Sequence, residues 1–113
     1  KKCGVRIAAG TDFVLADCPW CVLPEVVEVL SRFGLSNMEA IESATRVGAE
    51  VLGLEDRLGT VETGKWADLV LVDRDPLDDI KALAEVSWVM QGGRVIPRSP
   101  EWNRRPVRDP LPL

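Results

Sequence analysis

The chain has 113 residues, of which 46% are hydrophobic and 28% are charged, and its net charge is −4. This length has room for one domain with its own hydrophobic core, and the acidic balance gives no electrostatic reason to expect nucleic acid as a partner. No apolar run approaches the roughly 18 residues of a membrane-spanning helix, and the start from Lys1 to Gly4 is not followed by a signal-peptide core, so we expect a cytoplasmic protein without a membrane partner.

The first predicted element is a strand over residues 5–9, with the mostly apolar sequence Val-Arg-Ile-Ala-Ala. The turn residues Gly10, Thr11 and Asp12 end it. Strands of this composition are typical of sheets that are covered on both faces. The segment therefore predicts neighbouring strands.

A helix is predicted from Pro24 to Phe33. Proline suits the first turn of a helix, and Gly34 is a typical stop. One face of this helix is apolar and the opposite face is charged. The apolar positions are Val26, Val27, Leu30 and Phe33.

A second helical stretch begins at Ser36 and Glu39, whose spacing is that of a capping box. Met38, Ile41 and Val51, with several alanines, supply its apolar positions. Gly53 is the expected stop, and residues 45–48 are the point at which the stretch would divide in two.

After the second helical stretch the pattern changes to short strands separated by turns. We predict one strand over residues 59–61, a turn at Gly64 and Lys65, and a buried strand over residues 68–73. The segment from Pro76 to Ile80 resembles one turn of helix.

A hairpin is predicted between residues 86–90 and 94–96. Gly92 and Gly93 lie between these two segments, and glycine adopts the positive φ angles of a type I′ turn at no steric cost. The tail from Pro97 is rich in proline and arginine and predicts an extended or disordered segment.

Taken together, these motifs resemble the C-terminal portion of proteins in the metal-dependent amidohydrolase superfamily, in particular its imidazolonepropionase and prolidase-like members. The resemblance extends from Gly4 to about Ile96 and depends on the order and spacing of several fragments. In chain order these are Ala9-Gly10-Thr11-Asp12, Gly34-Leu35-Ser36-x-Met38-Glu39-Ala40, Ala44-Thr45, Leu52-Gly53, Gly59-Thr60-Val61-x-x-Gly64-Lys65-x-Ala67-Asp68-Leu69-Val70-x-x-Asp73, Pro76-Leu77-x-Asp79-Ile80 and Val89-x-x-Gly92-Gly93-Arg94-Val95.

The resemblance implies a role for Asp12, which matches an aspartate at the end of the eighth barrel strand in that superfamily. There the aspartate contacts the metal and takes a proton from the attacking water. Active sites of such barrels lie at the carboxyl ends of the strands, where a carboxylate can both bind a cation and accept a proton. From the residues alone, the favoured interpretation is that Asp12 caps a turn after Gly10 and Thr11, and the resemblance reverses this preference.

The other metal ligands that the resemblance implies are missing. In the superfamily they are a His-x-His pair on the first strand and further histidines on middle strands, often with a bridging modified lysine, whereas this chain has no histidine. Catalytic zinc usually has three protein ligands, so one carboxylate does not suffice. We expect a divalent metal, zinc above all, in the complete enzyme, and no metal and no hydrolase activity in this chain alone.

Two departures from the superfamily pattern affect the inference. Val47-Gly48 stands where asparagine-alanine usually follows the threonine, and the loop after Asp12 has an unfamiliar composition. Because that loop would line the pocket, the substrate cannot be inferred from it.

A competing motif lies in the same loop. Cys18-Pro19-Trp20-Cys21 follows an apolar run and precedes the first helix, as in thioredoxin-like oxidoreductases. A thiol at a helix N-terminus has a lowered pKa, which favours the reactive thiolate. Cys18 and Cys21 are thus candidates for a redox pair or for two zinc ligands. Against this, an odd total of three cysteines favours reduced thiols, and the chain has no further elements of a thioredoxin fold.

The predicted fold class is α/β. Residues 1–53 would form the last strand and helices of a (β/α)8 amidohydrolase barrel, residues 54–97 would form strands of a small β-sandwich, and residues 98–113 would form a tail. The predicted function is that of a C-terminal fragment of an enzyme that hydrolyses carbon–nitrogen bonds in an amide, a cyclic amide or a dipeptide, with Asp12 as metal ligand and general base. The alternatives are a thiol redox or zinc-thiolate protein and a non-catalytic assembly module. Expected partners are the missing N-terminal barrel portion or further copies of the chain, because bare strand edges favour association.

Overall fold

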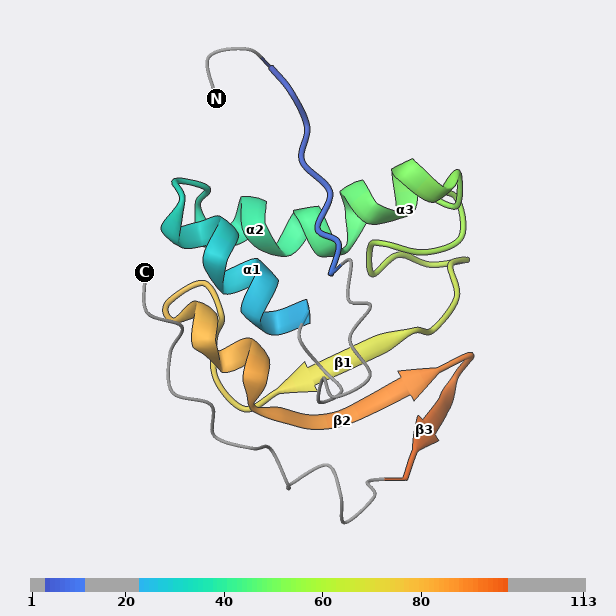
Figure 1. Ribbon diagram of the computed structural model, residues 1–113. Coiled ribbons are helices and arrows are strands. Elements are labelled where there is room, and N and C mark those ends of the chain that lie inside the picture. The colour runs from blue at the N-terminus through green and yellow to red at the C-terminus, as the bar shows by residue number, and fades with distance from the viewer. Residues whose placement is uncertain (1–3, 12–22, 98–113) are drawn as a thin grey trace.

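The computed structural model describes residues 4–11 and 23–97. In chain order the elements are α1 (Leu23–Arg32), α2 (Asn37–Ala44), α3 (Arg46–Leu52), β1 (Leu69–Val72), the 3₁₀ helix η1 (Ile80–Ala84), β2 (Val86–Gln91) and β3 (Arg94–Ile96). Figure 1 shows the three α-helices together on one side of the molecule and the sheet on the other, with residues 4–11 running against α2 and α3. The molecule is a small α/β structure whose sheet has three strands within the described residues.

The helices follow the predicted signals closely. Ser36 is the N-cap of α2, and it forms the predicted capping box with Glu39. The helical stretch divides at Thr45, where φ is −123° and ψ is −92°, so α2 and α3 are separate helices. Gly53 ends α3 with a φ of 66°, in the left-handed region that glycine adopts readily. Local capping chemistry therefore explains where α2 begins and where α3 ends.

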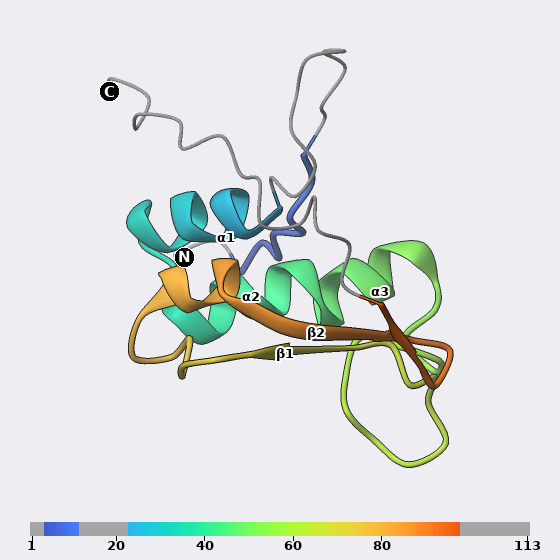
Figure 2. The ribbon, with the colours of Figure 1, turned by 90° about the horizontal axis from the view of Figure 1, so that it is seen from below.

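The sheet is antiparallel with the strand order β1-β2-β3. Leu69 of β1 is opposite Met90, and the register shifts between Leu71 and Val72. The predicted hairpin is confirmed: Gly92 and Gly93, with φ angles of 56° and 78°, join β2 to β3. Figure 2 shows β1 beneath β2 in side view, with β3 at the far end.

The core lies where α1, α2 and η1 meet. Val27, Ala40 and Ile80 are buried there, although Ile80 lies far along the chain from the two helices. The partly buried residues that pack around them are Ala9, Leu30, Leu35, Ile41, Ala44 and Leu83. Residues 4–11 thus reach the core through Ala9. Phe33, predicted to belong to the apolar face of α1, instead follows the helix and is 76% exposed.

The prediction of a buried strand over residues 5–9 is wrong for this chain. The segment forms no strand, and Val5 is 77% exposed and Ile7 44% exposed. A strand of this type is buried only when neighbouring strands and helices cover it. Within the described residues the sheet consists of β1, β2 and β3, and residues 5–9 do not join it.

Two strand predictions after Gly53 also need correction. Residues 59–61 form no strand, since 59 and 60 lie in a bend and 61 is irregular, and the strand predicted over residues 68–73 is the shorter β1. This strand is not buried, since Val70 is 61% and Leu71 46% exposed. Consecutive strand residues point to opposite faces, so β1 has uncovered apolar surface on both. No helix in the described part of the chain is long and apolar enough to cross a membrane.

Candidate functional site

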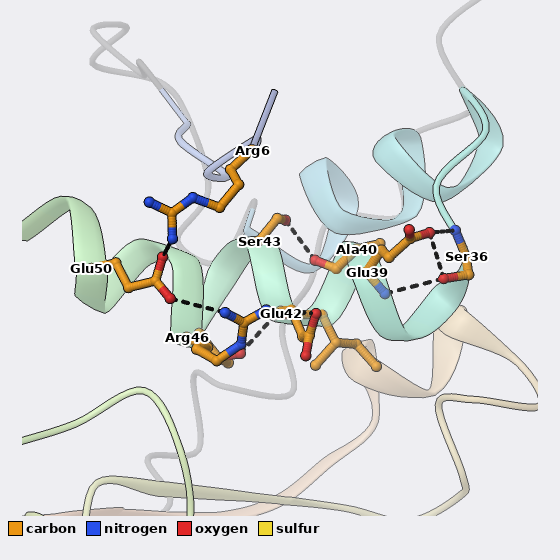
Figure 3. A network of polar contacts seen from close by, with 10 residues as sticks. Arg6, Ser36, Glu39, Ala40, Glu42, Ser43, Arg46 and Glu50 are labelled. Atoms are coloured by element: carbon orange, nitrogen blue, oxygen red, sulfur yellow. Dashed lines mark hydrogen bonds and ion pairs between the residues drawn. The ribbon is translucent and has the colours of Figure 1, made fainter. Parts of the chain in front are cut away.

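The candidate catalytic residue Asp12 lies outside the described residues, but the segment that leads to it is described. Residues 4–11 are held on the helices at two points, of which Figure 3 shows the contact of Arg6 with Glu50. The backbone N–H of Ala9 donates a hydrogen bond to the carbonyl oxygen of Ser43 at 2.9 Å. The guanidinium of Arg6 forms an ion pair with the carboxylate of Glu50. The chain is therefore anchored shortly before Asp12.

The carbonyl of Ser43 is available because α2 ends one residue later. The last carbonyls of a helix have no partner within it and must find one elsewhere. Thr45 satisfies two of them, donating from Oγ1 to the carbonyl of Ile41 at 2.9 Å and from its N–H to that of Glu42 at 3.2 Å. The carbonyl of Ser43 receives Ala9. The break at Thr45 thus creates the acceptor that holds residues 4–11.

The side chain of Ser43 adds to this anchor. Ser43 is only 1% exposed, and its hydroxyl donates to the carbonyl of Ala40 at 2.6 Å. A buried hydroxyl needs such a partner, since burying it unpaired would cost free energy. The hydroxyl bond fixes the Ser43 side chain on the preceding turn, and the Ser43 backbone carbonyl accepts from Ala9.

A row of alternating charges continues from Arg6 along the helices (Figure 3). Glu50 accepts from Arg46 through one carboxylate oxygen at 2.9 Å, and its other oxygen contacts Arg6. Arg46 also donates to Glu42 at 3.1 Å. The hydrogen bond and the charge of Glu42, with a smaller contribution from Glu50, raise the pKa of Arg46 above its ordinary value. The carboxylates of Glu42 and Glu50 are thus paired with arginines, and neither is placed with two further donors to hold a metal ion within the described residues.

Gly59 packs against the junction of α2 and α3. Its φ is 96°, and a Cβ atom placed on it would lie 2.7 Å from the Cβ of Ala49 and 3.1 Å from the Cα of Arg46. The same atom would lie 3.2 Å from the carbonyl oxygen of Thr45. Glycine is therefore required by contact as well as by backbone angle. This close approach brings the loop after α3 to the same junction that anchors residues 4–11.

Two other residues of the quoted motifs stabilise loops. The amine of Lys65 donates to the hydroxyl of Thr60 at 2.6 Å, which closes the turn around Gly64. The carboxylate of Asp68 accepts from the N–H of Gly92 at 2.7 Å and ties β1 to the hairpin turn. The turn predicted at Gly64 and Lys65 is confirmed. The side chains of Lys65 and Asp68 both have structural partners.

A second arginine, in the loop after β1, pairs with the carboxylates at the two ends of η1. Arg74 donates to both oxygens of Glu85, at 2.8 and 2.7 Å, and to Asp79 at 3.3 Å. The hydrogen bond from Arg74 lowers the pKa of Glu85, and the backbone N–H of Lys81 is the main cause of a lowered pKa at Asp79. These contacts cap η1 and hold the turn before it, and they do not reach residues 4–11.

The described residues do not by themselves make up a metal site. Residues 4–11 and 23–97 contain no group of three histidine, cysteine, aspartate or glutamate side chains placed to hold an ion. Asp12, Cys18 and Cys21, the candidates for metal binding and for redox chemistry, all lie outside the described residues. A complete metal shell would need donors in addition to those described.

Arg6, Ser43 and Glu50 were not among the residues predicted to have a role, although the sequence contains two signals for them. Arg6 is the one charged residue in the apolar run from Val5 to Ala9, and a charge in such a run needs a partner. Glu42, Arg46 and Glu50 follow one another at a spacing of four, which places them on one helical face.

Comparison with known proteins shows extensive similarity. The model of the amidohydrolase family matches residues 1–96. The imidazolonepropionase of Symbiobacterium thermophilum is 29% identical over 106 residues, which cover 90% of this chain and 25% of that protein. The 5'-deoxyadenosine deaminase of Methanobrevibacter smithii is 47% identical over 51 residues, covering 45% of this chain and 12% of that protein.

Among solved structures, a putative prolidase from Bifidobacterium longum superimposes with a TM-score of 0.80 at 35% identity. The match covers 86% of this chain and 24% of that one. The chain thus spans about a quarter or less of the length of these relatives.

Proposed function

The chain belongs to the amidohydrolase family, and on that basis we propose that it is the C-terminal part of a metal-dependent hydrolase that cleaves carbon–nitrogen bonds in an amide, a cyclic amide or a dipeptide. The observation that carries the proposal is the anchored segment 4–11, which leads directly to Asp12. The relatives named imidazolonepropionase and putative prolidase support cleavage of a cyclic amide or of a dipeptide. The relative named 5'-deoxyadenosine deaminase supports cleavage of a carbon–nitrogen bond in general.

Asp12 is the proposed general base and a proposed metal ligand. A carboxylate placed at the end of a barrel strand can take the proton of the attacking water. A bound divalent metal, with zinc the most suitable, would lower the pKa of water and polarise the scissile carbonyl. The remaining ligands would come from a histidine-bearing part of the barrel, since this chain contains no histidine.

The proposed architecture extends the described fold. Residues 1–53 would complete a (β/α)8 barrel, with residues 5–9 as its last strand, and residues 54–97 would contribute to a small β-sandwich beside it. Residues 98–113 would form a separate tail. The uncovered apolar side chains of Val5 and Ile7, and those of Val70 and Leu71, support this proposal because each pair would gain a neighbour in the larger fold.

The natural length of the protein tests the proposal directly. An antibody against residues 23–97 should detect, in the source cells, a protein several times larger than the 12.4 kDa of this chain. Its sequence should contain a His-x-His pair before the matched region. A natural protein of 12.4 kDa would instead favour the assembly module.

We predict that the isolated chain retains no stoichiometric zinc after dialysis. One carboxylate leaves most of the coordination shell to water, whereas catalytic zinc sites usually supply three protein ligands. Elemental analysis of the dialysed chain is the measurement. One zinc per chain that disappears on Asp12→Asn but persists on Asp78→Asn, an exposed control, would contradict the prediction. Loss on Cys18→Ser would support the zinc-thiolate alternative.

We also predict that the isolated chain forms a homodimer, while in the complete protein the same surfaces bind the rest of the barrel. Within the part of the chain that the structure describes, β1 is an edge strand, and it exposes Val70 on one face and Leu71 on the other. Open edges of this kind pair with other chains, and two-fold dimers are the commonest closed assembly. Light scattering over a dilution series should show a mass of two chains that falls to one on dilution.

Val70→Lys should shift this equilibrium toward monomer, because a lysine on an edge strand opposes pairing. Val61→Lys is the matched control, since Val61 is 84% exposed and lies in a loop outside the sheet. A monomer at every concentration, for the unmodified chain as well as for Val70→Lys, would show that association needs a different partner.

A further inference from the structure

Residues 4–11 are attached to the helices in an unusual way for a segment of this composition. Among the described residues, the backbone bond from Ala9 to Ser43 is the contact that replaces a strand ladder. A single hydrogen bond acts as a pivot, because it leaves the chain on either side free to turn. A second attachment is needed to fix the direction in which the chain leaves Thr11.

The ion pair between Arg6 and Glu50 supplies that second attachment (Figure 3). The side chain of Glu50 is only 21% exposed, and its other carboxylate oxygen is held by Arg46 at 2.9 Å. Arg46 is held in turn by Glu42 at 3.1 Å. Glu50 is therefore already oriented by α3 when it accepts Arg6, so little rotamer freedom remains to be lost.

The exposure of these side chains argues against a role in stability. The side chain of Arg6 is 68% exposed and that of Arg46 is 41% exposed. Ion pairs at this exposure contribute little to the free energy of unfolding. The row of four charges, from Arg6 through Glu50 and Arg46 to Glu42, adds little stability but joins residues 4–11 to α3. Its role is better explained by the placement of residues 4–11.

We infer that Arg6 and Glu50 are positioning residues that set the course of the segment leading to Asp12. This inference rests on the proposed function only for the role of Asp12. Catalytic groups must be held close to their productive geometry, and a displacement of about 1 Å can lower the rate roughly 10²-fold. Arg6 and Glu50 would act through the backbone and would not touch the substrate.

The attachment itself can be tested on the chain as it stands. Hydrogen exchange at the Ala9 amide should accelerate about 2- to 5-fold in Arg6→Gln and in Glu50→Gln, the change expected when an exposed ion pair that holds the segment is lost. Arg74→Gln is the matched control: Arg74 is an exposed arginine whose ion pairs with Glu85 and Asp79 do not reach residues 4–11, so exchange at Ala9 should not change. Unchanged exchange in Arg6→Gln would overturn the inference.

The positioning role is tested in the complete protein. Arg6→Gln should lower kcat about 10- to 100-fold with little change in KM, as for residues that orient a catalytic group. Arg6→Lys, which keeps the charge, should recover part of the loss. Faster exchange at Ala9 with an unchanged kcat would overturn the positioning role.

The two proposals fail in different ways. If the complete unmodified protein has no hydrolase activity, the proposed function is wrong, whereas the exchange experiment still decides whether Arg6 and Glu50 hold the segment. A melting temperature of Arg6→Gln equal to that of the unmodified protein would show that a fall in kcat does not arise from unfolding.

Discussion

Asp12→Asn is expected to lower kcat of the complete hydrolase by about 10²- to 10⁴-fold, the contribution that a positioned general base typically makes. Asparagine has nearly the same size and can still offer a carbonyl oxygen to a metal, but it cannot accept a proton near neutral pH. The loss should therefore appear in kcat, with a much smaller change in KM. Steady-state kinetics with a cyclic amide and a dipeptide substrate provide the measurement.

Asp78→Asn is the control for this substitution. Asp78 is exposed in the turn before η1, and the same chemical change there should leave kcat unchanged. Metal content must be measured on both variants. If excess zinc fully restores the activity of Asp12→Asn, then Asp12 acts as a ligand alone and the proposed proton transfer is wrong.

Gly59→Ala is expected to lower the free energy of unfolding by about 2–4 kcal/mol. Roughly 1 kcal/mol comes from placing a side chain at positive φ, and about 1–3 kcal/mol comes from overpacking. The new Cβ would lie 2.7 Å from the Cβ of Ala49, well inside van der Waals contact, and the Cα of Arg46 at 3.1 Å blocks a small shift. Urea unfolding followed by circular dichroism measures the change.

Gly64→Ala separates the two causes. Its φ of 94° is close to that of Gly59, but no atom lies within 4 Å of the added Cβ. We expect a loss of only about 1 kcal/mol there. Equal losses at the two positions would show that the contact with α3 does not matter.

A double-mutant cycle tests the same contact directly. Ala49→Gly removes the nearest atom, so Gly59→Ala combined with Ala49→Gly should destabilise the chain by less than the sum of the two single changes. Strict additivity would mean that the two residues do not meet. The cycle also remains informative if Gly59→Ala alone is too unstable to study.

Local chemistry in the sequence was sufficient for several elements. The capping box of Ser36 and Glu39, the left-handed Gly53 and the hairpin at Gly92 and Gly93 all depend on residues close together in the chain. Such features form from short-range hydrogen bonds and backbone preferences, so their spacing predicts them. The family was recognisable for the same reason, since its motifs are runs of these local signals.

The sequence by itself determined the helices, the hairpin and the family. Only the tertiary structure decided which of the remaining segments are buried and what they contact. Residues 5–9 have the composition of a buried strand, yet burial depends on neighbours that composition does not supply. The attachment of Arg6 to Glu50 joins residues 44 positions apart, and Gly59 meets Ala49 across a loop. Contacts of this kind are set by how elements pack in space, and the pattern along the chain does not contain that information.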